Sequence, residues 1–225
     1  MMQTMATLPI LFEDGEALVI DKPAGLPVDP PRNGGESLAD HLDSLRLGFQ
    51  RLPLPVHRLD TDTSGCLLLA RNPKAHKRFA KAFEEKRVMK RYIGLVGGEL
   101  ADSEGVIDLA LSKVSSAQGG WRMIAAKKGK PSVTHWRRLA VRDGLTMVEF
   151  APLTGRTHQI RIHALAGLGF PLLGDPVYGS GRDPRASRTM LHALSLEVER
   201  EKKPPISAHS PLPAAFTAIG FAELT

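Results

Sequence analysis

Polar residues at two places in the sequence have types that could bind a metal or attack a substrate. His158 and His163 are five residues apart, so on a helix they would lie about 140° apart around the axis. Zinc sites on a single helix use a pair four residues apart on one face, so we expect no shared metal. Ser64 lacks the G-x-S-x-G elbow and Cys66 lies in an apolar run, so we expect neither to be a nucleophile.

A glycine flanked by lysines at 128–131 is the nearest approach to a nucleotide-binding loop. This stretch, KKGKP from residue 127 on, lacks both the leading glycine and the Ser/Thr of a phosphate loop. A G-x-G-x-x-G pattern after a strand is missing from the sequence as well. We therefore expect no nucleotide cofactor.

The composition is that of a globular protein in a reducing compartment. Of 225 residues, 42% are hydrophobic and 24% charged, and the single cysteine excludes an intrachain disulfide. We expect one domain spanning residues 1–225. Residues 1–16 lack the pattern of a signal peptide, and no apolar run approaches the ~20 residues of a membrane span, so we expect a cytoplasmic protein without membrane contact.

The net charge of +6 favours a polyanionic partner. Residues 71–91 hold nine Lys/Arg against two Glu, so the basic character is concentrated in this segment. Such a run is either a solvated helix face or a surface that follows phosphates. A helix is expected to begin at Pro73, with a narrow apolar stripe for packing and with Lys77, Arg78 and Lys81 free to face the phosphates of a polyanion.

Strand patterns dominate the remaining sequence and position the polar residues. A hairpin is predicted around Asp14-Gly15, a short helix with a capping box from Ser37, and a buried strand at 66–70. Five further extended runs follow, then a helix over about 157–166 and a late strand. This order favours an α+β fold with a mixed, mainly antiparallel central sheet flanked by helices.

Four blocks of sequence together resemble the RluA-type family of RNA pseudouridine synthases, and they follow that family's order. The pair HRLD-x-x-TSG and GRTHQIR is the most specific part of the resemblance. The blocks are DKPAGLPV (21–28), HRLDTDTSGCLLLA (57–70), KRYIGLVG (90–97) and LTGRTHQIRIHALAGLGFPLLGDPVYG (153–179).

The resemblance implies isomerisation of uridine to pseudouridine within RNA, without cofactor or metal. Asp60, the Asp of HRLD, matches the family's essential carboxylate, whereas Asp62 does not match. An ionised carboxylate can attack the sugar or base, or assist proton removal from the sugar. Arg161 matches the arginine that pairs with this carboxylate and keeps it ionised, and Tyr92 matches the tyrosine that faces the target uracil, by stacking or by proton transfer.

The resemblance also implies RNA contacts. Arg58 matches the arginine that helps expel or replace the flipped nucleotide, and we expect His57 and Arg156 to contact the substrate too. The RNA is a stem-loop of rRNA or tRNA. The first block begins at Asp21, so we expect a short form without a separate N-terminal RNA-binding domain, acting as a monomer.

Two other functions compete with an isomerase. One is a catalytically silent RNA-binding protein on the same fold, and the other is a hydrolase that uses His57 or His158 as a base. The joint presence of Asp60, Tyr92 and Arg161 argues against a silent protein, and detection of pseudouridine in treated RNA would exclude both alternatives.

Overall fold

The computed structural model describes residues 8–116, 120–179 and 183–221, which form two compact units. Unit 1 consists of Met1–Met89 with Ala193–Pro211, and unit 2 of Lys90–His192 with Leu212–Thr225. The expectation of a single domain stays a prediction. The expectation for residues 1–16 falls partly on residues 1–7, which lie outside the described residues.

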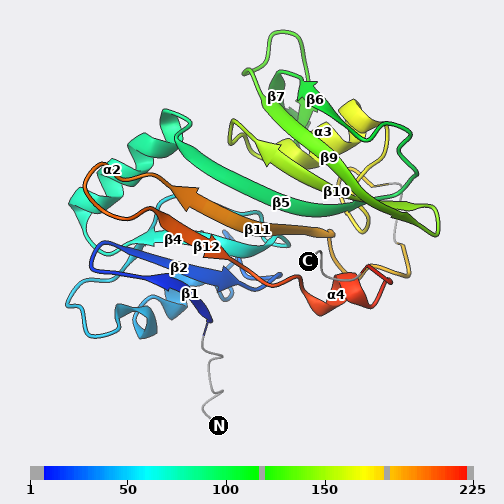
Figure 1. The fold of residues 1–225 in the computed structure, drawn as a ribbon. Helices are drawn as coiled ribbons and strands as arrows, with labels where there is room; N and C mark the ends of the chain where they lie inside the picture. The colour runs from blue at the N-terminus through cyan, green and yellow to red at the C-terminus, as the bar shows by residue number, and fades with distance from the viewer. Residues whose placement is uncertain (1–7, 117–119, 180–182, 222–225) are drawn as a thin grey trace. The chain divides into compact units, whose positions relative to one another are not determined.

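Unit 1 contains strands in the order β1-β2-β4-β11, with β12 beside β11 and β3 beside β4 (Figure 1). Its helices are short except for α2. The elements are β1 (Ile10–Glu13), β2 (Ala17–Lys22), α1 (Leu38–His41), a 3-10 turn (Ser44–Arg46), β3 (Leu54–Pro55), β4 (Ser64–Ala70), α2 (Pro73–Glu84), β11 (Leu191–Val198) and β12 (Ile206–His209).

Local sequence signals in unit 1 are confirmed. β1 and β2 form the antiparallel hairpin expected around Asp14-Gly15, and Ser37 forms a capping box with Asp40 at α1. Every residue of β4 is buried, so Cys66 is a core residue. Burial and the nearby Asp21 carboxylate raise the pKa of the Cys66 thiol to about 12, which keeps it protonated and unreactive.

The helix predicted from Pro73 is α2, and Asn72 caps it by accepting a hydrogen bond from the Ala75 backbone N–H at 2.9 Å. Phe79 and its neighbours on one stripe are buried in a cluster with β2, β4, β11 and β12. That stripe consists of Ala75, Phe79, Ala82 and the partly buried Phe83, as the sequence predicts.

Unit 2 contains strands in the order β5-β10-β9-β6 and a separate two-stranded sheet, β7-β8. Pairings β5–β10, β10–β9, β9–β6 and β7–β8 are all antiparallel. The elements are β5 (Val88–Val96), β6 (Glu104–Asp108), β7 (Leu111–Ser116), β8 (Gly120–Ala125), β9 (Val133–Arg142), β10 (Leu145–Pro152), α3 (Gln159–Leu168) and α4 (Ala214–Thr217).

Helix α3 packs on the unit 2 sheet through Ile160 and Ala164, which share a buried cluster with Phe150 of β10 and Val96 of β5 (Figure 1). Its start differs from the predicted position near residue 157. His158 has a φ of +53° and so cannot belong to the helix, which begins one residue later. The antiparallel pairing and few helices confirm the α+β fold.

The glycine of the T-S-G motif is required by close packing within unit 1. Gly65 has a φ of +106°, and a Cβ atom there would lie 2.2 Å from the carbonyl oxygen of Ala193. Both the conformation and the contact exclude a side chain. The motif therefore specifies how β4 packs beside β11.

We predict that Gly65→Ala lowers the free energy of unfolding by about 1–3 kcal/mol, through backbone strain and overpacking. Gly15→Ala is the matched control, because a Cβ atom at Gly15 would meet no atom within 4 Å. It should change stability by less than about 0.5 kcal/mol. Urea unfolding of both variants measures the difference, and equal stabilities would contradict the close-packing explanation.

Candidate active site

Asp60 lies in the loop that joins β3 to β4 in unit 1, and the backbone around it is braced by hydrogen bonds. The Asp60 carbonyl accepts from the Thr63 N–H at 3.0 Å, and the Thr61 carbonyl accepts from the Gly25 N–H at 2.9 Å. The Asp60 side chain is half-buried. The loop thus presents this carboxylate from a backbone with fixed hydrogen bonds.

A buried lysine ties the first motif to this loop. Lys22 has no exposed surface, and its ammonium donates to the carbonyls of Pro23 (2.8 Å), Leu26 (2.8 Å) and Thr61 (3.0 Å). Three carbonyl acceptors match the three N–H donors of an ammonium, which offsets the cost of burying the charge. Lys22 therefore links the D-K-P-A-G block to the residue that follows Asp60.

The two residues expected to contact RNA near Asp60 have different surroundings. The His57 ring stacks on Phe83 with centroids 4.7 Å apart, and its Nε2 accepts from the Leu68 backbone N–H at 3.1 Å. Arg58 is exposed, and its guanidinium pairs with the Asp29 carboxylate at 2.7 Å. His57 thus contacts the second half of β4, whereas Arg58 projects into solvent.

In unit 2, Arg161 of α3 forms a buried ion pair that the sequence did not predict. Its Nε and Nη2 donate to the two oxygens of Asp175, each at 2.7 Å. Asp175 Oδ1 also accepts from the backbone N–H groups of Val177 (2.9 Å) and Tyr178 (3.0 Å). Burial raises the pKa of Asp175, but the hydrogen bonds and charge of Arg161 lower it by more. The pKa therefore lies below its ordinary value, and the carboxyl is ionised at neutral pH.

Tyr178 extends this pair into a small network. The Arg161 guanidinium lies 5.0 Å from the centroid of the Tyr178 ring. The Tyr178 hydroxyl lies 2.8 Å from His158 Nδ1 and accepts from the Met123 backbone N–H at 3.0 Å. The G-D-P-V-Y segment therefore orients both the arginine and the histidine of the G-R-T-H-Q-I-R block.

The other polar residues of that block hold the loop before α3. Gln159 Oε1 accepts from Thr154 Oγ1 (2.8 Å) and from the Arg156 backbone N–H (2.9 Å), while Gln159 Nε2 donates to the Val133 carbonyl (3.1 Å) and Thr134 Oγ1 (3.0 Å). All four hydrogen-bonding positions of the buried amide are used. Gln159 thus has a structural role, and the Arg156 side chain is exposed.

Tyr92 lies on β5 and packs against the cluster that contains Ile160 and Ala164 of α3. The structure thus brings Tyr92 together with the helix that carries Arg161. Two residues earlier on the same strand face, Lys90 Nζ lies 3.5 Å from the Thr154 carbonyl, and burial lowers its pKa to about 8. The pairing of Asp60 with Arg161 stays a prediction.

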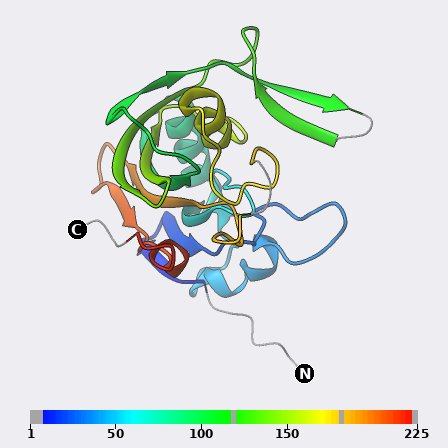
Figure 2. The same ribbon diagram turned by 90° about the vertical axis from the view of Figure 1, so that its right-hand side faces the viewer.

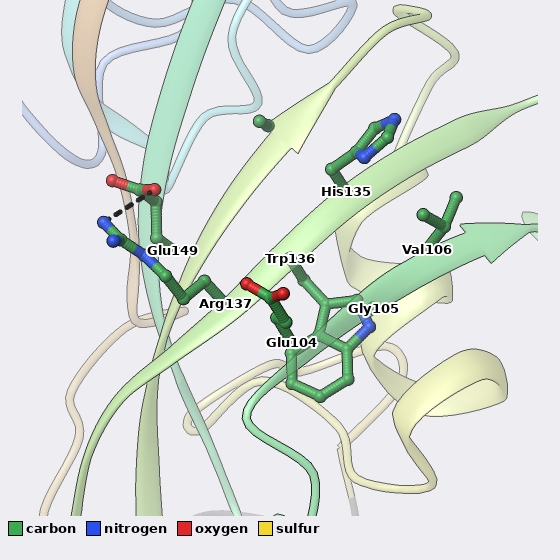
Figure 3. A pocket seen from close by; sticks show the side chains of 8 residues that line it. Glu104, Gly105, Val106, His135, Trp136, Arg137 and Glu149 are labelled. Atoms are coloured by element: carbon green, nitrogen blue, oxygen red, sulfur yellow. Dashed lines mark hydrogen bonds and ion pairs between the residues drawn. The ribbon is translucent and has the colours of Figure 1, made fainter.

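Other features of the described residues do not compete with this site. Between residues 8 and 221, outside the gaps at 117–119 and 180–182, no cluster of His, Cys, Asp and Glu could hold a metal, and no helix could span a membrane. His163 is buried between Thr134 Oγ1 and the Leu109 carbonyl, away from His158. Unit 2 also has a cavity of about 310 Å³ beside Trp136, where Arg137 pairs with Glu149 (Figure 3), but none of the predicted site residues line it.

We predict that Lys22→Met destabilises the protein by about 1–3 kcal/mol for each carbonyl left without a donor, less what water restores. Lys74→Met, at an exposed position of α2, is the control and should leave stability nearly unchanged. Thermal and urea unfolding measure both variants. Equal stability of the two would show that the Lys22 ammonium is dispensable for the loop.

We also predict that Arg161→Met lowers the free energy of unfolding by about 3–5 kcal/mol at neutral pH, because it leaves the Asp175 carboxylate buried without a counter-charge. This loss of stability should shrink on acidification. Without Arg161, burial raises the pKa of Asp175, so the folded state of the variant accepts a proton as the pH falls. Asp175→Asn should be equally destabilising but show no such relief, because Arg161 cannot lose its proton.

Arg185→Met tests the same change at an exposed pair with Asp183 and should have little effect. Urea unfolding from neutral pH to about pH 4 measures all three variants. Parallel pH profiles for Arg161→Met and Asp175→Asn would contradict the assignment of the buried pair.

Comparison with known proteins identifies the origin of the motifs. The RNA pseudouridylate synthase family matches residues 16–166. An uncharacterized RNA pseudouridine synthase of Zymomonas mobilis is 56% identical over 94% of this chain and 97% of its own length. The ribosomal large subunit pseudouridine synthase D of Nitrosomonas europaea is 38% identical over 94% of this chain, which spans 64% of that protein.

Solved structures agree with these sequence matches. Human RNA pseudouridylate synthase domain containing 1 is 31% identical with a TM-score of 0.76, covering 95% of this chain and 90% of that one. Human RNA pseudouridylate synthase domain containing 4, at 24% identity, shares the fold with a TM-score of 0.77, covering 94% and 91%. The RluA-type resemblance is thereby confirmed, and the chain belongs to the RNA pseudouridine synthase family of isomerases.

Proposed function

We propose that this enzyme isomerises specific uridines in structured RNA, with Asp60 as its catalytic carboxylate. The braced loop carries the proposal, because the backbone on both sides of Asp60 is held by Thr63, Gly25 and Lys22. A reacting group must keep its position to be effective, and such a loop limits its movement. The names of the relatives support large-subunit rRNA as the first substrate to test. We propose tRNA as the second substrate to test, from the family resemblance alone.

The reaction rearranges one nucleotide without net gain or loss of atoms. The bond from uracil N1 to the ribose breaks, the uracil turns, ring carbon C5 joins the ribose, and the proton displaced from C5 is balanced by one gained at N1. Asp60 acts either as nucleophile toward the sugar or base, or as base toward the sugar. The uridine must first leave its stack, because the reacting atoms are inaccessible within a helix.

Arg161 and Tyr92 complete the proposed site. Arg161 supplies the positive charge that keeps Asp60 ionised when the flipped base excludes water. Its second carboxylate partner, Asp175, fixes the plane of the guanidinium through two hydrogen bonds. Tyr92 faces the uracil, by stacking or by proton transfer, from a strand that packs with α3.

Arg58 is the proposed replacement for the flipped nucleotide. Its pair with Asp29 is exposed on both sides, with 65% and 59% of the side chains accessible. An exposed pair contributes little stability, so Arg58 can leave Asp29 for RNA at small cost. Arg156, also exposed, is proposed to contact phosphate, and His57 to support the loop beside the RNA.

The basic face of α2 is a further proposed phosphate contact. Lys77 is exposed, whereas Arg78 pairs with Glu16 at 2.6 Å and Lys81 with Glu85 at 3.5 Å. These ion pairs neutralise part of the face. Lys77 therefore offers the least compensated charge of the three.

We predict that Asp60→Asn abolishes pseudouridine formation while leaving RNA affinity and folding unchanged, since the amide keeps the size but loses the negative charge. Asp62→Asn, two residues later in the same loop, is the matched control and should remain active. Carbodiimide-directed primer extension on an unmodified transcript of large-subunit rRNA, and on tRNA, detects the product. Turnover of folded Asp60→Asn within about tenfold of wild type would refute the assignment.

A catalytically silent RNA-binding protein would give a different result. Wild type would then bind the transcripts but produce no carbodiimide-dependent stops in primer extension. The same assay on wild type thus separates the isomerase from its rival.

A further inference from the structure

A second basic stretch lies outside the α2 segment. Residues 109–142 contain eight Lys/Arg and no Asp or Glu. The basic charge is therefore not confined to residues 71–91, as the charge arithmetic suggested, because acidic residues elsewhere mask this stretch in the sum. Five of the eight lie on the β7–β8 hairpin and the turn after it, and all five are exposed: Lys113, Arg122, Lys127, Lys128 and Lys130.

These five cations differ from the basic residues of α2 in their surroundings. Within the described parts of the chain, none of the five forms an ion pair with a carboxylate, whereas Arg78 and Lys81 on α2 both do. A hairpin with charge of one sign and without compensating acids attracts a polyanion. Figure 2 shows the hairpin extending beyond the other strands of unit 2, while its base packs on α3 through Met123 and Ile162.

The hairpin also presents a tryptophan. Trp121 on β8 has 46% of its surface exposed. Lys113 Nζ lies 4.6 Å from the centroid of the indole ring, and the His158 ring stacks on the indole at 5.2 Å with an interplanar angle of 27°. Proteins that grip RNA strands combine such aromatic platforms with basic side chains.

We infer that the β7–β8 hairpin is an RNA-binding arm, in which Trp121 stacks on a nucleobase while Lys113, Arg122, Lys127 and Lys128 contact phosphates. This inference rests on the proposed function, which supplies RNA as the polyanion. The contact between Lys113 and the indole lies at an exposed site, where such a contact is weak. A nucleobase can therefore take its place and leave the ammonium available to phosphate.

The residues that contact Trp121 connect the hairpin to α3, the helix that carries Arg161. His158 holds the indole by stacking and the Tyr178 hydroxyl by its Nδ1, and Tyr178 lies under the Arg161 guanidinium. The backbone of β8 reaches the same hydroxyl through the Met123 N–H. The platform is thus pre-positioned by residues of the family motif.

Fluorescence gives a direct test of stacking, because Trp121 and Trp136 are the two tryptophans of the chain. In a Trp136→Phe background that retains wild-type activity, binding of an oligouridylate or of unmodified rRNA transcript should quench the remaining indole emission. Unquenched emission at saturating RNA would overturn the stacking contact.

Binding by fluorescence anisotropy tests the arm as a whole. Trp121→Ala should weaken RNA affinity about 5- to 150-fold and Trp121→Phe much less, since stacking one base contributes about 1–3 kcal/mol. Replacing Arg122, Lys127 and Lys128 by Gln should reduce the slope of log affinity against log salt by about 2 to 3, for three phosphate contacts. A double control, Arg51→Gln with Lys202→Gln, changes exposed charge in unit 1 and should have a smaller effect per charge.

Unchanged affinity and salt slope in the hairpin variants would overturn the inference. An equal loss per charge in the control would also overturn it, because net charge alone would then explain binding. Pseudouridine formation by wild type, measured in parallel, keeps the two proposals apart. An active wild type with unaffected hairpin variants refutes the arm alone, whereas an inactive wild type refutes the proposed function.

Discussion

The buried pair of Arg161 and Asp175 is the interaction on which the polar architecture of unit 2 depends. Both side chains are almost fully buried, and Asp175 accepts two N–H donors from the guanidinium and two from the backbone. Desolvation makes such a pair a poor source of net stability, and its value lies in fixing geometry. With Arg161 fixed, the Tyr178 ring below it and the His158 ring bonded to Tyr178 also have one arrangement.

In unit 1 a buried cation is stabilised by backbone acceptors. The buried ammonium of Lys22 donates to three carbonyl oxygens, those of Pro23, Leu26 and Thr61. These neutral acceptors hold the loop through its backbone. The two units thus use buried cations differently: Lys22 orders backbone, and Arg161 orders side chains.

Sequence patterns predicted those parts of the fold that depend on neighbours along the chain. The apolar stripe of α2, the turn at Asp14-Gly15 and the buried strand β4 follow from periodicity and turn residues. The Arg161–Asp175 pair spans 14 residues and depends on how the G-D-P-V-Y segment folds back on α3, which periodicity does not encode. The start of α3 was misplaced because the left-handed conformation of His158 is a response to its contacts and is unmarked by a glycine.

The residues of the family motifs and the exposed residues around them have different roles, and the difference bears on substrate choice. In the G-R-T-H-Q-I-R block, Gln159 holds the loop together with the preceding Thr154, and the His158 ring stacks on Trp121, so part of this block maintains structure. Besides Arg58 and Arg156, the proposed RNA contacts come from exposed residues that the motifs do not include, such as Lys113 and Arg122. Phosphate contacts add affinity without reading sequence, and stacking tolerates any base. Under the proposed function, such an arm would raise the occupancy of many RNAs, and the choice of uridine would arise from the shape of the RNA that brings one nucleotide to the proposed site at Asp60.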